Sequence, residues 1–337
     1  MSCKSNTLAK NYTNHPLRIN EIHLPWKPTI PNTHYEFVRA QVVDLLNELG
    51  LCEDKKERDR RDGVIMLASY MYPEAGPQEL LFGTMYVLWL FFFDDIFDES
   101  KFLKEECNQA AERSLHIFRT GKAPEKNAKL NFSIVQLEDL LLRIFAMAND
   151  LAKSSDITAR FMKSCEIYFV DGAVPMENFR QMKTLPKLEE YLAVRTIDGG
   201  AAACIACFEI VAHLDLSDDI VNEPRVLRMC EIAGQQIAYA NDIYSYHREK
   251  LHNNSMNSLN IRCQTLSFED ALTEQIAQLN GWVQEFETLK QSLAESALWE
   301  NSLKMYITGM ENIVMGCKVW SESCTRYNLK SLLTVVV

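Results

Sequence analysis

Two acidic clusters, each inside an apolar stretch with helical spacing, constrain the fold of this chain most strongly. The first lies at 91–99 and reads Phe-Phe-Phe-Asp-Asp-Ile-Phe-Asp-Glu; the second lies at 241–249 and reads Asn-Asp-Ile-Tyr-Ser-Tyr-His-Arg-Glu. Carboxylates among aromatic residues are costly to bury unless positive charge lies beside them. Divalent cations such as Mg²⁺ take oxygen ligands and usually bind phosphates as well. The clusters therefore predict two helices that face each other across an apolar cavity and bind a polyphosphate ester with an apolar tail.

The rest of the chain is also predicted to be helical. Apolar residues recur at helical spacing, and almost no segment alternates with the period of two that strands require. We expect helices over 35–49, 58–71, 78–97, 104–120, 135–152, 157–182, 187–214, 223–249, 267–293 and 296–327. Gly50 and Gly121 should close two of them, and Gly199-Gly200 should interrupt the helix over 187–214. The pattern predicts an all-α protein with a central apolar cavity.

The first 31 residues differ from the remainder because they hold four of the ten prolines. Proline fixes φ and removes a backbone donor, so this part should form an extended arm on the body of the protein. We expect an arm over 1–33 and a single helical domain over 34–337.

Composition and charge exclude several classes of function. The net charge of −11 argues against a nucleic-acid surface, which needs clustered Lys and Arg. No run reaches the roughly 18 apolar residues of a membrane span. The polar start over 1–16 lacks the features of a secretory signal, so we expect a cytoplasmic protein. Ten cysteines without CxxC pairing then indicate mostly buried thiols.

In the first cluster, Asp94 and Asp98 share a helix face because they are four residues apart. Like charges at this spacing repel, and a metal ion reverses the sign of that interaction. The alternative is a solvated acidic turn at a helix end. It fits poorly with the preceding apolar residues 89–93 and with the negative end of the helix dipole. Asp95 is expected to pair with an arginine.

In the second cluster, Asn241, Ser245 and Glu249 form one stripe about 12 Å long on a helix. Amide, hydroxyl and carboxylate oxygens all suit hard cations. The alternative is the polar face of an amphipathic helix, although Asn and Ser compete with helix hydrogen bonding and are unusual in a helix interior. The polar segment 252–258 beside the stripe should be a mobile loop that could act as a lid.

Together the clusters resemble the metal-binding motifs of class I terpene synthases of the single-domain microbial type. The aspartate-rich motif of that family corresponds to residues 94–98, and its second motif corresponds to Asn241, Ser245 and Glu249. Arg195 lies 46 residues before Asn241, where the family carries a diphosphate-sensing arginine. The resemblance covers about residues 60–330.

Five further residues match positions of the same family. Asp198 and Gly199 correspond to the linker and effector positions that follow the sensor arginine in the family. Arg326-Tyr327 corresponds to the C-terminal Arg-Tyr pair, and Trp320, six residues before Arg326, corresponds to the cavity tryptophan. The resemblance assigns catalytic roles to Arg195, Asp198, Gly199, Arg326 and Tyr327. It implies a class I terpene synthase helical bundle.

The resemblance implies a Mg²⁺-dependent enzyme that ionises an allylic isoprenyl diphosphate and cyclises the carbocation to a terpene hydrocarbon or alcohol. Farnesyl diphosphate is the favoured substrate and geranylgeranyl diphosphate the second. Three Mg²⁺ ions are expected, with Mn²⁺ as an alternative. Asp94 and Asp98 would bind two ions, and Asn241, Ser245 and Glu249 would bind the third. A homodimer is compatible with this class.

The substrate should contact two sets of side chains. The diphosphate-binding set is Arg195, Arg248, Arg326 and Tyr327. The aromatic candidates for the cavity wall are Phe91 and Trp320, followed by Trp89 and Phe169, although aromatic residues of this kind are often plain core.

Two alternatives remain at this point. A prenyl-chain elongation enzyme shares the fold and the first motif but carries a second aspartate-rich motif, which this sequence lacks. A non-catalytic helical protein could hold an apolar ligand, but that function leaves the carboxylates in apolar surroundings unexplained.

Overall fold

A computed structural model describes residues 16–51, 55–98, 104–125, 131–182, 184–252 and 254–327; the side chains of 55–57, 95–98, 104 and 132 are outside this description. Within these ranges the regular structure is helical and no strand occurs. The α-helices are α2 (Tyr35–Leu49), α3 (Lys55–Met71), α4 (Pro77–Asp98), α5 (Lys104–Thr120), α6 (Phe132–Leu151), α7 (Ser155–Ile167), α8 (Val174–Gln181), α9 (Leu188–Asp198), α10 (Ala201–Val211), α11 (Asp218–Val221), α12 (Pro224–Leu251), α13 (Ser258–Arg262), α14 (Phe268–Ala294) and α15 (Asn301–Ser323). A 3₁₀ turn, η1 (Ile19–Glu21), precedes them, and a π-helical turn, η2 (Tyr168–Ala173), joins α7 to α8.

The predicted helix ends at glycines are confirmed. Gly50 and Gly121 follow α2 and α5 with φ of 66° and 65°, which is the left-handed region that glycine enters without a steric penalty. Gly200 has φ of 69° and lies between α9 and α10, so the expected interruption is present.

Two predicted helices differ from the structure. The helix over 157–182 is divided by η2, where Gly172 lies so close to α9 that a Cβ atom would be 2.7 Å from the backbone nitrogen of Asp198. The helix over 296–327 begins later, because Ser296 turns the chain by donating from its backbone N–H and its hydroxyl to the carbonyl of Leu293. The short helices α11 and α13 were not expected.

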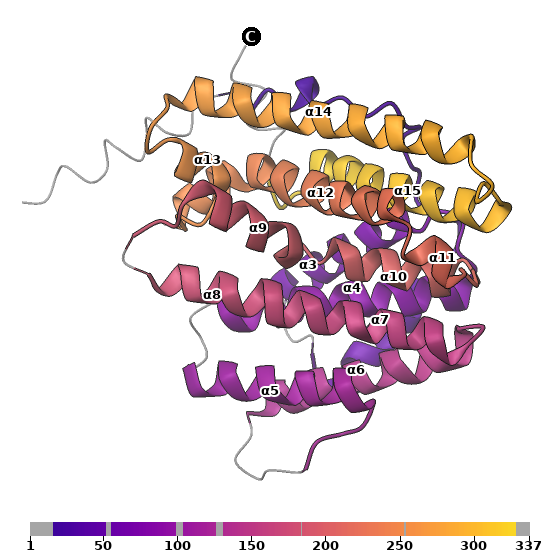
Figure 1. Cartoon of the computed structure of the whole chain (residues 1–337). Coiled ribbons are helices and arrows are strands. Elements are labelled where there is room, and N and C mark those ends of the chain that lie inside the picture. Colours follow the sequence, from indigo (N-terminus) through magenta and orange to yellow (C-terminus); the bar gives the residue numbers. More distant parts are fainter. Residues whose placement is uncertain are drawn as a thin grey trace, which may run out of the picture.

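The helices pack in layers, with α14 at one side in Figure 1, α5 and α6 at the other, and α4, α10 and α12 between them. Helix α4 is apolar on nearly all sides from Leu80 to Phe93, which is the pattern of a buried helix. Helices α12 and α14 pack against each other: Gln236 donates to the carbonyl of Leu279, and Gln275 donates to the carbonyl of Tyr239. This antiparallel pair fixes α12 beside the centre of the bundle.

The described part of the N-terminal arm runs along α14, where it is visible in indigo in Figure 1. Trp26 packs edge-on against Phe286 and donates from its indole to Glu287. Farther on, Asn32 donates from its side-chain amide to the carbonyls of Tyr72 and Ala75, which ties the arm to the end of α3.

No helix in the described ranges has both the length and the apolar character needed to cross a membrane. The eight cysteines in the described part of the chain are free thiols, as the lack of CxxC pairing indicated. Only Cys165, Cys204 and Cys207 among them are buried and the other five are partly buried, so the expectation that most are buried is wrong for this part of the chain.

Candidate active site

A cavity of about 230 Å³ lies inside the bundle and brings together residues from both acidic clusters. Side chains of α3, α4, α8, α9, α10, α12 and α15, together with η2, form most of its lining. The predicted site residues that line it are Phe91, Asp94, Arg195, Asp198, Gly199, Asn241, Ser245, Arg248, Glu249, Trp320, Arg326 and Tyr327. The side chain of Asp98 lies outside the described residues, as does that of Asp95. The predicted metal-binding, diphosphate-binding and catalytic residues with described side chains, together with Phe91 and Trp320, therefore line one shared space.

Helix α4 contributes the first cluster to the cavity. Phe91 and Asp94 lie one turn apart on the same face of the helix, and both are half-buried because they border the cavity. The remaining faces of α4 pack into the core, so the carboxylate of Asp94 borders the cavity near the C-terminal end of an otherwise apolar helix.

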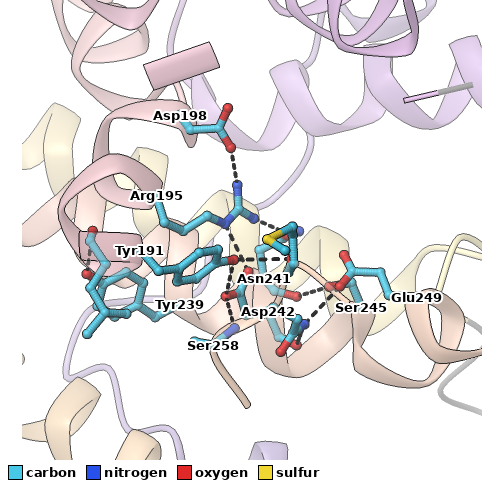
Figure 2. Close-up of polar contacts among 12 residues, drawn as sticks. Tyr191, Arg195, Asp198, Tyr239, Asn241, Asp242, Ser245, Glu249 and Ser258 are labelled. Atoms are coloured by element: carbon cyan, nitrogen blue, oxygen red, sulfur yellow. Dashed lines mark hydrogen bonds and ion pairs between the residues drawn. The ribbon is translucent and has the colours of Figure 1, made fainter. Parts of the chain in front are cut away.

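Helix α12 contributes the second cluster along the opposite wall. Asn241, Ser245 and Glu249 follow one another at four-residue intervals, as Figure 2 shows. The hydroxyl of Ser245 donates to the carbonyl of Asn241 at 2.7 Å, the usual bond of a helical serine to the preceding turn. The amide of Asn257 donates to Glu249 Oε2 at 2.9 Å. Burial, with the nearby Asp242 carboxylate, raises the pKa of Glu249 above its ordinary value, so this site favours added positive charge.

Arg195 is the centre of a buried ionic network. Its guanidinium donates to Asp242 Oδ1, Asp198 Oδ2 and Asn241 Oδ1, each at 2.9 Å (Figure 2). The side chains of Asp198 and Asp242 are only 5% and 1% exposed, and this guanidinium is the positive group bonded to both carboxylates. Burial alone would lower the pKa of Arg195, but the carboxylates, Asp242 foremost, outweigh it and raise that pKa well above its ordinary value.

Asp242 has a structural position that the sequence did not indicate. It accepts hydrogen bonds from Arg195, from the phenol of Tyr191 at 3.0 Å and from the backbone N–H of Ser258 at 2.9 Å. These bonds join α9, α12 and the start of α13. One sequence signal for this position of Asp242 was available. Asp242 directly follows Asn241, and successive residues on a helix are about 100° apart, so Asp242 should point to a different side from the cavity-facing Asn241.

The segment predicted to be a mobile loop is anchored at several points, with position 253 outside the described residues. Asn257 donates to the carbonyl of Asp242 at 2.7 Å, and the carbonyl of Met256 accepts from the phenol of Tyr191 at 3.3 Å. Asn254 and Met256 line the cavity. The segment thus closes one side of the site beside Glu249.

The chain after α15 adds Arg326 and Tyr327 to the cavity lining. The amide of Asn241 donates to the phenol oxygen of Tyr327 at 2.7 Å. The guanidinium of Arg326 lies 5.5 Å from the centre of the Phe91 ring. Trp320 packs edge-on against Phe91, with ring centres 6.2 Å apart, and its indole donates to the carbonyl of Gly63. An aromatic face thus lies directly beside the charged end of the cavity.

Three arginines predicted to hold diphosphate line the same end of this cavity. Burial, together with the charge of Arg326, lowers the pKa of Arg248. Two guanidinium groups brought together out of water favour an anion between them. A third guanidinium, that of Arg195, faces the same space from α9.

A further cavity residue, Arg180 on α8, was missed. It lies near enough to Asp198 to act on the pKa of that carboxyl, and its ion pair with Glu177 is long at 3.7 Å. No motif pointed to it, because η2 is what turns this face of α8 toward the cavity.

Two of the aromatic residues considered for the cavity wall, Trp89 and Phe169, do not line the cavity and are core residues, which is the alternative given for them above. Trp89 is fully buried and stacks on Phe93, with ring centres 5.0 Å apart. Phe169 packs edge-on against the same Phe93 ring. Trp89 precedes Phe91 by two residues and so points to a different side of α4.

Comparisons with known proteins agree with this geometry. Residues 85–300 match the family model described as terpene synthase family 2, C-terminal metal binding. The chain is 68% identical over 323 residues to terpene synthase 1 of Physarum polycephalum, which covers 96% of this chain and 97% of that protein. It is 24% identical over 325 residues to terpene synthase 1 of Dictyostelium purpureum, covering 92% and 83% of the two chains.

Solved structures show the same fold at low sequence identity. A linalool/nerolidol synthase from Streptomyces clavuligerus, in complex with 2-fluorogeranyl diphosphate, has a TM-score of 0.77 and 18% identity, covering 90% of this chain and 99% of that one. An α-eudesmol synthase has a TM-score of 0.75 and 17% identity, covering 89% and 98%.

The all-α bundle and its cavity therefore define a class I terpene synthase fold, as predicted. The chain belongs to the terpene synthase family and is a terpene synthase. Family membership sets aside the two alternatives, the chain-elongation enzyme and the non-catalytic binding protein.

Proposed function

We propose that this terpene synthase binds an allylic isoprenyl diphosphate together with divalent cations, Mg²⁺ in the first place, and cyclises the carbocation formed when diphosphate departs. Farnesyl diphosphate is the favoured substrate and geranylgeranyl diphosphate the second. The observation that carries the proposal is that Asp94 and the stripe of Asn241, Ser245 and Glu249 line one cavity from two helices, with arginines between them.

The donor atoms present suit a hard divalent cation. The stripe offers amide, hydroxyl and carboxylate oxygens. The raised pKa of Glu249, caused first by burial, is what a cation would reverse.

We assign one cation to Asn241, Ser245 and Glu249, and two to Asp94 with Asp98. Asn241 Oδ1 already accepts from Arg195, and a carbonyl oxygen has a second lone pair for a metal. When bound, the cations supply positive charge that stabilises the negative charge developing on the departing diphosphate.

The guanidinium groups of Arg195, Arg248 and Arg326 would donate to the diphosphate oxygens, and the phenol of Tyr327 would add a neutral donor. Forked donation from arginine suits phosphate oxygens and strengthens as charge builds on the leaving group. Asp198 would keep Arg195 oriented through the bond between them, and the backbone at Gly199 would border the cation path.

The allylic cation would then lie against aromatic faces. Phe91 and Trp320 are the nearest to the charged end, and the guanidinium over Phe91 supports a role of this ring in stabilising positive charge. Each face contributes about 0.5 to 2 kcal/mol in a desolvated site. The reaction ends when the cation loses a proton or captures water.

The substrate preference draws support from relatives. A protein of Postia placenta named sesquiterpene synthase 6 is 25% identical to this chain over 304 residues. The C10 analogue 2-fluorogeranyl diphosphate in the Streptomyces clavuligerus structure supports the binding of an allylic diphosphate and not the choice of C15. A cytoplasmic location and a homodimer also belong to this proposal, and light scattering on a sizing column tests the homodimer.

The deciding experiment offers C10, C15 and C20 allylic diphosphates separately to purified protein with Mg²⁺, with Mn²⁺ and with EDTA. Diphosphate release and extracted products are measured by a coupled assay and by gas chromatography with mass spectrometry. We expect cation-dependent release and cyclic C15 products, unchanged when isopentenyl diphosphate is added. Failure to release diphosphate from every substrate would refute the proposal.

A further inference from the structure

The N-terminal arm contributes two side chains, Ile22 and Leu24, to the lining of the cavity. Ile22 is only 3% exposed, and Leu24 is half-buried against the main core. Both lie well before the family-model match at residues 85–300, so neither the motifs nor that match points to them.

The arm is held at this position by bonds to both sides of Ile22. The backbone N–H of His23 donates to Asn280 Oδ1, and the amide of Asn280 donates to the carbonyl of Glu21, each at 2.9 Å. Trp26 adds the ring contact and hydrogen bond to α14 described above. The side chain of Asn280 thus hydrogen-bonds to the backbone on both sides of Ile22, which fixes this part of the arm against α14.

The point where the arm meets the bundle lies away from the charged end of the cavity. Asn280 follows Leu279, whose carbonyl accepts from Gln236 on α12, so the arm crosses at the level of Gln236. Gln236 precedes Asn241 by five residues, about 8 Å along the helix axis, and lies on the side away from Glu249. The arm therefore borders the part of the cavity that an apolar tail would occupy.

The cavity lining also includes Ile237 of α12, one residue after Gln236, and Cys317 of α15. Ile22 and Leu24 of the arm thus line the cavity together with side chains of α12 and α15. A smaller side chain at this place would lengthen the space for the tail and weaken the barrier between the carbocation and water.

We propose that Ile22 and Leu24 are specificity-determining residues, which limit the length of the isoprenyl tail and keep water from the carbocation. This inference rests on the proposed function. Wild-type turnover in the same assay tests that function separately, so the two can fail independently.

The test compares Ile22→Ala, Leu24→Ala and Leu24→Phe with wild type. Ile30→Ala is the matched control, because Ile30 lies on the same arm but is 71% exposed and does not line the cavity. For each protein the ratio of kcat/KM for geranylgeranyl over farnesyl diphosphate is measured, together with the proportion of alcohol among the products. Thermal unfolding shows whether each variant is folded.

The two alanine variants should raise the C20 to C15 ratio at least about tenfold, the lower end of the effect of one methylene group in an apolar pocket, and should raise the alcohol proportion. Leu24→Phe should lower the C20 to C15 ratio, and Ile30→Ala should match wild type. If Ile22→Ala does not fold, the inference is still tested by Leu24→Ala and Leu24→Phe, which should shift the C20 to C15 ratio in opposite directions. Folded Leu24 variants with the substrate ratio and products of Ile30→Ala would overturn the inference.

Discussion

Replacing Arg195 by methionine should destabilise the folded protein by about 3 to 5 kcal/mol, because it leaves buried carboxylates without their counter-charge. The guanidinium is bonded to Asp198 and Asp242, whose side chains are 5% and 1% exposed. Asp242 retains two donors, Tyr191 and Ser258, which offset part of its loss. The expected cost is therefore that of one broken buried pair, and not twice that value.

The destabilisation should depend on pH with a definite sign. Burial already raises the pKa of Asp198 above its ordinary value although Arg195 opposes the shift, and removing Arg195 raises that pKa further. A carboxyl whose pKa is higher in the folded than in the unfolded protein binds its proton more tightly when folded. Stability is then lost as the pH rises through the interval between the two pKa values and is regained in acid. The deficit of the variant should be larger at pH 8 than at pH 5.

The assay is thermal unfolding in metal-free buffer from pH 5 to 8. Arg195→Met should lower the Tm by about 5 to 10 °C at pH 8, and Arg195→Met with Asp198→Asn should recover about 2 to 4 °C of this with a flatter pH profile. The matched control is Arg119→Met, which removes a half-exposed ion pair with Glu166 and should change stability by less than about 1 kcal/mol. A Tm of Arg195→Met within about 1 °C of wild type at pH 8, or a deficit that grows in acid, would refute the reasoning.

Three further outcomes are expected. Glu249→Gln should lower kcat/KM at least about 100-fold in the diphosphate-release assay. The control Glu231→Gln, at an exposed position on the same helix, should leave kcat/KM unchanged. Equal activities of the two variants would contradict the role of Glu249. Phe91→Leu should slow turnover about 2- to 30-fold or divert products toward acyclic ones, because it removes about 0.5 to 2 kcal/mol of cation stabilisation; an unchanged rate and product profile would show that this ring does not contact the cation. Burial raises the pKa of the Cys204 thiol to about 12, so the native protein at pH 8 should resist iodoacetamide at Cys204 until denatured, and rapid labelling seen by peptide mass spectrometry would contradict that burial.

The fold was predictable because its local signals agree with one another. Helical periodicity, closing glycines at 50 and 121 and the Gly199-Gly200 interruption all act over a few residues, and each coincides with a helix end in the structure. The helix expected over 157–182 is present, but the π-helical turn η2 divides it into α7 and α8. That turn lies against α9, whose residues are some distance along the chain. Local propensity carries no information about such a neighbour.

The cavity wall was predictable only in part. Spacing correctly put Phe91 and Asp94 on one helix face, but the choice between Phe91 and Trp89 depends on how α4 is rotated in the bundle. That rotation is decided by packing on every side of an apolar helix, and an apolar helix has no polar face to reveal it. Arg180 escaped notice for a similar reason, since its approach to the cavity depends on the π turn before α8.

The sequence by itself indicated two oxygen-bearing clusters, because the residues of each are neighbours on a single helix and helix geometry puts them on one face. The resemblance of these clusters to the metal-binding motifs of class I terpene synthases then indicated the class of the protein. Tertiary structure alone decided which groups meet across the cavity. It pairs Arg195 with Asp242 and Asn241, brings Arg326 over Phe91, and seats Ile22 of the arm beside α12. These contacts join residues far apart in the chain, and close packing of the whole bundle, which no short segment encodes, decides which of them form.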